Sequence, residues 1–413
     1  MKNLNNANIK SFLNCGYFLD YSHNLHVPKF KTSPELLINK TEVELIEHGS
    51  IILQEVIQDL FQKTSKHIVP LSGGLDSRAI IAALLNMTST ENIETYTFGM
   101  PGSYDYELGQ YIAKHFNIKN YAISFNDVQF NYDMLNDASS RFDHQTHLFY
   151  HPDYRIIEQR FSDYQYWSGF LGGESAGGHF YKFTRSNNNI NDNKHYFLKK
   201  NKYSAYPLDK SDFKALIGLI DIPEFASHMS NISTYEIIDF YNRQTKYIAP
   251  HVLPKGFNHA SPFATKKWLE FICSVPIKYR INCDLFEKIL LNLYPEFFKL
   301  PTKNKLGYGL DVSEFKFFRT RLINKIRQKT YGNSKRKDLN YFDFNEFIRE
   351  KSDVNRLVKD SLFQLEKSKR IDWLDIQKIY KSHMNKETNN GGIIQLLASL
   401  EINLRNNESL NLN

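Results

Sequence analysis

The sequence predicts an α/β fold, a parallel twisted sheet with flanking helices that is followed by a mainly helical C-terminal part. Strand-like and helix-like segments alternate between residues 67 and 125, and this alternation is typical of parallel strands joined by crossover helices. A glycine-rich turn follows the first predicted strand directly. Beyond residue 211, apolar residues recur mainly at helical spacing to the end of the chain.

The predicted elements around the glycine-rich turn follow one another closely. Residues 41–63 are predicted to form an amphipathic helix, because their apolar side chains recur at helical spacing. Strands and helices then alternate, with strands predicted at 67–71, 94–99 and 120–125 and helices at 78–85 and 105–116. Pro70 lies in the first predicted strand, where its missing N–H argues against a central position. We therefore expect Pro70 at the last bonded position of that strand.

The following segments are predicted with less regularity. A long helical stretch rich in Phe, Tyr and His is expected to run to Gln165, and the asparagine-rich segment 185–202 is expected to form an exposed loop. We divide the chain into an N-terminal lead-in with the amphipathic helix at 1–63, a core at 64–310 and a helical C-terminal extension of the same domain at 311–413.

Composition indicates a globular protein with a sizeable core, since 41% of the 413 residues are hydrophobic and 14% are aromatic. The N-terminal residues lack the apolar core of a signal peptide, and no stretch is apolar enough to span a bilayer. We therefore expect a cytoplasmic protein without a membrane partner. Three cysteines occur without CxxC spacing, and we expect them to be reduced thiols in or near the core: Cys15, Cys273 and Cys283.

A basic run accounts for part of the formal net charge of +7. Nine Lys and Arg residues and no acidic residue lie between Lys316 and Lys337. Such a run suits either an anionic partner or the solvated face of a helix. The second interpretation is favoured, because nucleic-acid binding usually shows a clearer motif, and a nucleic-acid partner is not expected.

The strongest motif is the loop Ser72-Gly73-Gly74-Leu75-Asp76-Ser77 between a predicted strand and a predicted helix. Its glycines let the backbone N–H groups approach an anion, and the positive end of the following helix points to the same place. The serine hydroxyls add donors, and the aspartate can bind the Mg²⁺ that accompanies phosphates. An ordinary turn with a helix-capping serine is the alternative, but six consecutive suitable residues in this context favour a polyphosphate site.

Leu71 to Ser77 resembles the pyrophosphate loop of the N-type ATP pyrophosphatases, whose fold is HUP-like. Four later segments resemble the asparagine synthase family more narrowly: 97–103, the turn from Ser168-Gly169 to Gly177-Gly178, Pro262-Phe263 and 286–290. The resemblance implies that ATP and Mg²⁺ adenylate a carboxylate, that pyrophosphate leaves, and that ammonia or an amine attacks to give an amide and AMP.

The resemblance also implies roles for individual residues. Glu174 would bind magnesium together with Asp76, and it is the carboxylate left to act in catalysis. Lys288 would stabilise charge in the transition state, with a surface lysine on an amphipathic helix as the alternative. Two further sets of residues would hold ATP. The adenosine would be held by Leu71, Phe98, Ser168 and Gly169. The pyrophosphate would be held by Ser72, Gly73, Gly74, Asp76 and Ser77.

The sequence departs from the family pattern at three places. Lys2 stands where glutamine-using members have a cysteine nucleophile, so glutamine hydrolysis is not expected. Phe170 and Gly173 replace two acids of the glycine-rich turn, and Thr265 replaces the aspartate after Pro-Phe. The acceptor is therefore expected to differ from aspartate: a sugar acid of surface-polysaccharide synthesis, a peptide or an amino acid. The nitrogen donor would be ammonia, free or from a separate protein, or an amine.

Several alternatives stay open. A tRNA-modifying ATP pyrophosphatase would use the basic run as its RNA-binding surface, and a degenerate nucleotide-binding subunit would lack catalysis. His144, His147 and His151 lie at helical spacing and suit either zinc or, preferably, an aromatic-rich helix that lines the pocket. One of them, or Glu174, would serve as a general base. Asp105 follows the second strand and suits either magnesium or, preferably, the N-cap of a helix with an acid nearby.

Overall fold

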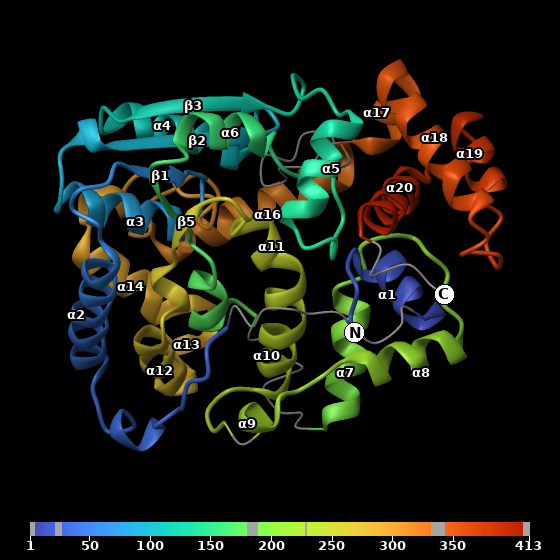
Figure 1. The fold of residues 1–413 in the computed structure, drawn as a ribbon. Coiled ribbons are helices and arrows are strands. Elements are labelled where there is room, and N and C mark those ends of the chain that lie inside the picture. Colours follow the sequence, from blue (N-terminus) through green and yellow to red (C-terminus); the bar gives the residue numbers. More distant parts are fainter. Residues whose placement is uncertain (1–4, 21–26, 180–188, 228, 332–342, 408–413) are drawn as a thin grey trace.

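The computed structural model describes residues 5–20, 27–179, 189–227, 229–331 and 343–407 (Figure 1). Its centre is a parallel five-stranded sheet in the order β3-β2-β1-β4-β5. The strands are β1 (His67–Pro70), β2 (Ile93–Gly99), β3 (Lys119–Ser124), β4 (Gln165–Trp167) and β5 (Asn258–Ala260). The predicted α/β fold is confirmed.

The strand order reverses between β1 and β4. The chain runs outward from β1 through β2 to β3 and then returns to add β4 and β5 on the other side of β1. In such sheets, ligands bind at the carboxyl ends of the strands where the order reverses. The loop after β1 therefore begins at the position where a ligand is expected.

Pro70 is the last residue of β1, as expected. It is paired in register with Tyr96 of β2, and the next residue, Leu71, donates its N–H to Tyr96 O at 2.8 Å. The ladder thus passes the proline without needing its missing donor.

Neighbouring residues of β1 point to opposite faces of the sheet and into two different cores. Val69 belongs to a core with α2 (Glu42–Leu60), α3 (Asp76–Leu85), α12 (Lys266–Ser274) and α14 (Asp284–Leu293). Ile68 belongs to a second core, rich in aromatic residues and in residues of the C-terminal helices. This alternation follows from the two-residue period of a strand.

The C-terminal helices form a separate layer beside the sheet, at the right of Figure 1. They are α17 (Phe344–Glu350), α18 (Ser352–Lys367), α19 (Ile376–Met384) and α20 (Gly391–Asn406). The N-terminal helix α1 (Asn6–Cys15) contacts α20 and α8 (Lys210–Leu219), whereas α2 packs on α14. The lead-in is thus shared between the two layers, and the division at residues 63 and 310 stays a prediction.

The expected long helix before Gln165 is wrong. Two helices occur, α5 (Tyr132–Arg141) and α6 (Tyr154–Phe161), with an irregular segment between them. Asp143 and His144 have φ angles of 57° and 55°, which a right-handed helix does not allow. The three histidines of this segment consequently do not share a helix face.

The expected loop at 185–202 is also wrong over its second part. Residues Ile190–Lys200 form α7, and the side chain of Asn189 caps this helix by accepting the N–H of Asp192 at 3.1 Å. Phe197 and Leu198 are buried and anchor the helix. An asparagine taken as a loop former therefore acts as an N-cap. Residues 185–188 lie outside the described part.

Two segments are π-helical. η3 (Glu174–Gly178) follows β4, and η4 (Asp239–Ile248) continues α10 (Thr234–Ile238) into α11 (Ala249–Val252). Figure 1 shows α10 and α11 as one continuous rod beside the sheet. Turns with π-helical bonding are rare and often occur at functional sites.

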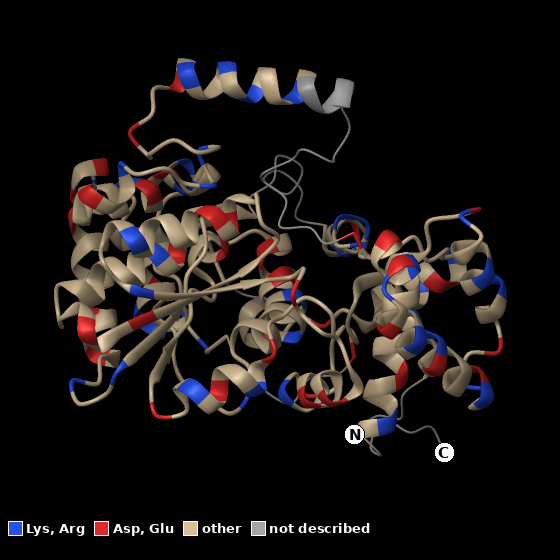
Figure 2. Cartoon of the chain, turned by 90° about the horizontal axis from the view of Figure 1, so that it is seen from above, with Lys and Arg blue, Asp and Glu red and all other residues tan. Residues whose placement is uncertain are grey.

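The first part of the basic run lies in helix α16 (Glu314–Tyr331), and Lys and Arg recur along it (Figure 2). Lys316, Arg319, Arg321 and Lys325 are exposed, as are the large apolar side chains of Phe315 and Phe318. The remaining basic side chains, Arg327, Lys329, Lys335, Arg336 and Lys337, lie outside the described part. Within the ranges given above, no helix is long and apolar enough to cross a bilayer.

Candidate active site

The loop from Ser72 to Ser77 connects β1 to α3 and turns back on itself. Ser72 N donates to Ser77 Oγ at 3.2 Å, and Gly74 N donates to Ser72 Oγ at 3.2 Å. A Cβ atom at Gly73 would lie 2.6 Å from the carbonyl oxygen of Tyr104, so only glycine fits there. The loop ends at the N-terminus of α3, where unpaired N–H groups favour an anion.

The turn after β4 closes on Asp76, the first residue of α3. A Cβ atom at Gly169 would lie 2.6 Å from Asp76 Cβ, and one at Gly172 would lie 2.2 Å from Asp76 Oδ1. Phe170 is buried in the core below this turn. Because Gly169 and Gly172 have no side chains, the backbone of the turn can pack directly against Asp76.

The surroundings of Asp76 disfavour its charged carboxylate, which a bound cation would stabilise. Burial and the charge of Glu174 raise its pKa to about 8, although a backbone hydrogen bond from Gly173 opposes the shift. Two carboxylates that repel each other are stabilised by a shared cation. Mg²⁺ commonly takes one or two carboxylates and completes its shell with phosphate and water. The residues present therefore fit Mg²⁺ with ATP.

The expected adenosine residues lie at the carboxyl ends of three neighbouring strands. Leu71 follows β1, Phe98 is near the end of β2, and Ser168 follows β4. Phe98 contacts Phe125 edge-on with ring centroids 5.8 Å apart, and Ser168 N donates to Ala260 O at 2.9 Å. The structure brings these residues to one edge of the sheet, and their contact with adenosine stays a prediction.

A lysine that the sequence did not reveal lies against the phosphate loop. Lys303 N donates to Gly73 O at 2.9 Å, and Lys303 Nζ lies 2.5 Å from Asp105 Oδ2. Asp105 is in the first turn of α4 (Tyr104–His115), which follows β2, and the expected N-cap role of Asp105 is wrong because Ser103 caps this helix. The paired lysines 303 and 305 between Pro301 and Gly307 were the available signal, but their approach to Gly73 depends on tertiary structure.

Arg78 holds the segment that leads to Lys303. Its buried guanidinium donates to three backbone carbonyl oxygens, at 3.1 Å to Phe297, 3.4 Å to Leu300 and 2.8 Å to Pro301. Burial lowers its pKa to about 10, so it stays charged at neutral pH. Because Arg78 lies on the first turn of α3, it ties Lys303 to the helix that begins at the loop.

Lys288, the expected catalytic lysine, has other partners. Its Nζ donates to Glu42 Oε1 at 2.6 Å and to Asp284 Oδ2 at 2.7 Å, on α2 and on its own helix. The neighbouring Glu287 instead pairs with Lys305, at 2.5 Å. The helix α14 thus directs Glu287 toward the lysine segment, and a catalytic role for Lys288 stays a prediction.

The histidines of the segment between α5 and α6 are packed in the interior. His147 Nε2 lies 2.9 Å from Tyr247 Oη, and burial lowers the pKa of His147 to about 3. His151 lies between the carbonyl oxygens of Leu148 and Pro152. Among the residues that the structure describes, no group of three His, Cys, Asp or Glu side chains is placed to hold a metal ion. The zinc alternative therefore finds no support.

The three cysteines are free thiols, as expected, with Cys15 and Cys273 buried. Cys283 lies beside the candidate site and donates from Sγ to Gly173 O at 3.4 Å. Burial, followed by the charges of Asp76 and Glu287, raises the pKa of its thiol. The neutral thiol of Cys283 therefore packs against the turn that contains Gly173.

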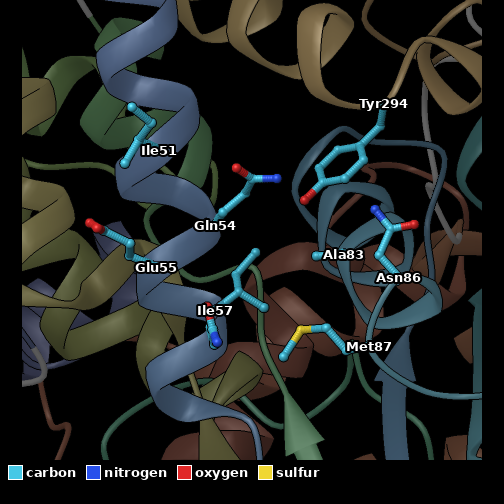
Figure 3. A pocket seen from close by; sticks show the side chains of 9 residues that line it. Ile51, Gln54, Glu55, Ile57, Ala83, Asn86, Met87 and Tyr294 are labelled. Carbon is cyan, nitrogen blue, oxygen red and sulfur yellow. The ribbon is translucent and has the colours of Figure 1, made fainter.

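A cavity of about 410 Å³ lies at the far end of α3 (Figure 3). Gln54 of α2, Asn86 and Tyr294 line it, together with apolar side chains. Asn86 is ten residues beyond Asp76, which corresponds to about 15 Å along a helix. This cavity is therefore separate from the phosphate loop.

The model of the asparagine synthase family matches residues 53–150. No curated protein matches the chain. The matched segment contains the phosphate loop, Phe98 and Asp105, whereas Glu174, Lys288 and Lys303 lie outside it. Residues 53–150 are thus similar to the asparagine synthase family, whose members are ATP-dependent amide ligases.

Proposed function

We propose that the protein is an AMP-forming ligase that adenylates a carboxylate with ATP and transfers ammonia or an amine to it. The observation that carries this proposal is the contact of the glycine-rich turn with Asp76, which brings Glu174 close to Asp76 at the start of α3. Such an arrangement serves to position a polyphosphate and to neutralise its charge.

Each part of the site has a task in this reaction. The loop N–H groups and the hydroxyls of Ser72 and Ser77 bind the β- and γ-phosphates and keep the α-phosphate next to the acceptor. Asp76 and Glu174 would hold Mg²⁺, which would neutralise charge on the leaving pyrophosphate. Lys303, anchored on Gly73, adds a positive charge on the same side. In these roles the residues position ATP and neutralise its charge, and none of them forms a covalent bond with the substrate.

The acceptor differs from aspartate in this proposal. Phe170 and Gly173 occupy positions where the family resemblance implies acids, and Phe170 is buried. Glu174 is then the carboxylate available when ammonia or an amine attacks the acyl-adenylate. It would act as a magnesium ligand or accept a proton from the attacking nitrogen. The acceptor classes are a sugar acid, a peptide and an amino acid.

Exchange of labelled pyrophosphate into ATP tests the proposal. The native protein, with Mg²⁺ and a panel of carboxylates, is expected to support exchange with at least one carboxylate, and Asp76→Ala is expected to abolish it. If the native protein binds ATP but exchanges no label across the panel, the ligase proposal fails and a nucleotide-binding subunit remains.

The exposed basic face of α16 supports the tRNA-modifying alternative. On that reading, tRNA binds and its affinity falls steeply with salt, because each neutralised phosphate releases counterions. Charge reversal at Arg319 and Lys325 would weaken such binding. Pyrophosphate exchange triggered by a small carboxylate in the absence of RNA would exclude this alternative.

A further inference from the structure

Helix α16 carries a stripe of large apolar side chains that faces solvent. The stripe consists of residues three or four positions apart, which therefore share one face of the helix: Phe315, Phe318, Leu322 and Ile326. Each of these side chains is between 50% and 78% exposed. Single exposed apolar side chains are common on proteins, whereas a contiguous group of them marks an interaction site. The stripe therefore indicates a contact surface.

The opposite face of α16 is attached to the rest of the protein. Phe317 and Thr320 are half-buried. Thr320 Oγ1 lies 3.3 Å from Tyr308 Oη, and Lys305 Nζ lies 5.3 Å from the ring centroid of Phe317. At 3.6 residues per turn, both attached residues point away from the stripe. Because α16 forms one edge of the molecule in Figure 2, the stripe is turned outward.

Basic side chains border the stripe on both sides. Helical spacing places Arg319 along one border and Lys325 along the other, and both side chains are exposed. Lys316 and Arg321 add two further charges, and no acidic residue occurs from residue 315 to residue 337. Long basic side chains can keep their charge in a polar layer while their methylene groups lie beside apolar atoms. The helix is therefore complementary to an apolar layer with a negatively charged surface.

We propose that α16 docks the protein on the surface of an anionic lipid bilayer, with the apolar stripe at the boundary of the acyl chains and the basic borders among the head groups. A helix with an apolar face beside Lys and Arg lies in the plane of the membrane interface. Anionic lipids attract its basic residues. We expected no membrane partner because no segment of the sequence is apolar enough to span a bilayer, but a surface contact needs no such segment.

Other occupants match this face of α16 less well. A second copy of the chain would bring a second set of basic side chains against the first, and like charges repel. RNA would use the charges but leave the apolar stripe in water, because its phosphates carry the affinity. An acidic groove of a protein would have to enclose a helix whose other face is already attached to Tyr308 and Lys305. A flat bilayer needs only the outer face.

Sedimentation of the full chain with lipid vesicles tests the proposal. The native protein is expected to bind vesicles of equal parts phosphatidylcholine and phosphatidylglycerol at least about tenfold more tightly than vesicles of phosphatidylcholine alone. The double variant Arg319→Gln/Lys325→Gln should weaken binding to the anionic vesicles about thirtyfold, since each basic residue near the surface contributes a factor of about five. Phe318→Gln should weaken it at least about tenfold, because an apolar side chain no longer leaves water.

Matched control variants lie on α18, away from the stripe. Phe363 is 56% exposed there, and Arg356 and Lys359 are exposed as well. Phe363→Gln controls for the loss of an apolar side chain, and Arg356→Gln/Lys359→Gln controls for the loss of two charges. Both controls should bind the anionic vesicles as the native protein does. An equal loss of binding in the controls would overturn the assignment to α16.

Three further outcomes would overturn the proposal. The first is that the native protein sediments with neither kind of vesicle. The second is that Phe318→Gln binds like the native protein, since the contact would then be electrostatic only. The third is tighter binding to polyuridylate or to polyglutamate than to the anionic vesicles, which would assign α16 to RNA or to an acidic protein. Should Phe318→Gln not fold, as judged by circular dichroism, Leu322→Gln replaces it with the same expected loss.

Discussion

Gly172 contacts Asp76 so closely that a Cβ atom at position 172 would lie 2.2 Å from Asp76 Oδ1. The turn after β4 and the loop after β1 are thereby joined at the carboxylate that is expected to hold the cation. Two segments nearly a hundred residues apart form one site because β1 and β4 are neighbours in the sheet. The first prediction follows from this contact.

Gly172→Ala is expected to displace Asp76 and to lower pyrophosphate exchange at least tenfold, which corresponds to about 1.4 kcal/mol of transition-state stabilisation. A methyl group at this position cannot be accommodated without a shift of backbone or carboxylate. Initial exchange rates at saturating ATP measure the effect.

Gly173→Ala is the matched control. A Cβ atom there meets nothing within 4 Å, and its φ of −64° suits any residue. Exchange by this variant should stay within about twofold of native. Equal losses in the two variants would contradict the steric role of position 172.

The binding of Mg²⁺ and ATP is expected to release a proton. Asp76 has a pKa of about 8 in the folded protein against an ordinary value of 3.8, so the folded chain keeps at pH 7 a proton that the unfolded chain has lost. In the absence of a cation, this residue makes the fold less stable as the pH rises from about 4 to about 8. Metal binding requires the carboxylate, so affinity should rise with pH until about 8.

Calorimetry in buffers of different ionisation enthalpy measures the released proton. We expect about one proton at pH 7 for the native protein and none for Asp76→Asn. Release that is equal in both proteins would place the proton on another group.

Lys303 and Lys288 are expected to differ in their effect on adenylation. Lys303→Met removes a charge beside Gly73 and should lower exchange about a hundredfold, the scale seen for loss of one preorganised donor. Lys288→Met breaks ion pairs with Glu42 and Asp284 and should change exchange by less than about threefold. The opposite order of effects would restore Lys288 as the catalytic lysine.

Arg78→Met is expected to lower the free energy of unfolding by about 3 kcal/mol, because three backbone carbonyl oxygens, one of them in a fully buried hydrogen bond, lose a charged donor. Urea denaturation measures this loss. Arg319→Met on the exposed face of α16 is the control, and it should change stability by less than about 0.5 kcal/mol. A loss of similar size at both positions would show that Arg78 does not clamp the segment before Lys303.

Much of the sheet could be predicted from the sequence, because its signals are local. The strands β1, β2 and β3 alternate with helical patterns, the loop is a contiguous motif, and Thr41 with Glu44 forms the capping box that starts α2, whereas β4 and β5 have three residues each and were not predicted. Even Pro70 could be placed, since a proline is tolerated where the ladder ends. These features depend on residues close together in the chain.

The two misplaced elements were predicted wrongly for different reasons. The stretch after α5 is rich in helix-compatible aromatic residues, yet positive φ angles at Asp143 and His144 end the helix and turn His147 toward Tyr247. The asparagine-rich stretch was predicted to be a loop because asparagine is common in loops. Asn189 instead is the N-cap of α7. Tertiary contacts overrode propensity after α5, whereas the start of α7 is a local N-cap that the polar composition obscured.

The candidate site was recognised through its motif residues and missed where contacts are long-range. The loop, Phe98 and Ser168 could be named from a resemblance, whereas Lys303 belongs to no motif. The link of Lys303 to the candidate site is its hydrogen bond to Gly73, which joins residues far apart in the chain. Such a contact appears only in the folded structure.

Adenylation of a carboxylate is the central claim, and transfer of ¹⁸O tests it most directly. A carboxylate that supports pyrophosphate exchange is labelled with ¹⁸O and incubated with the native protein, ATP, Mg²⁺ and ammonium. Mass spectrometry of the nucleotide product is expected to show one ¹⁸O in AMP, because the acyl-adenylate leaves one carboxylate oxygen on the phosphate. Unlabelled AMP, or formation of ADP in its place, would contradict the account.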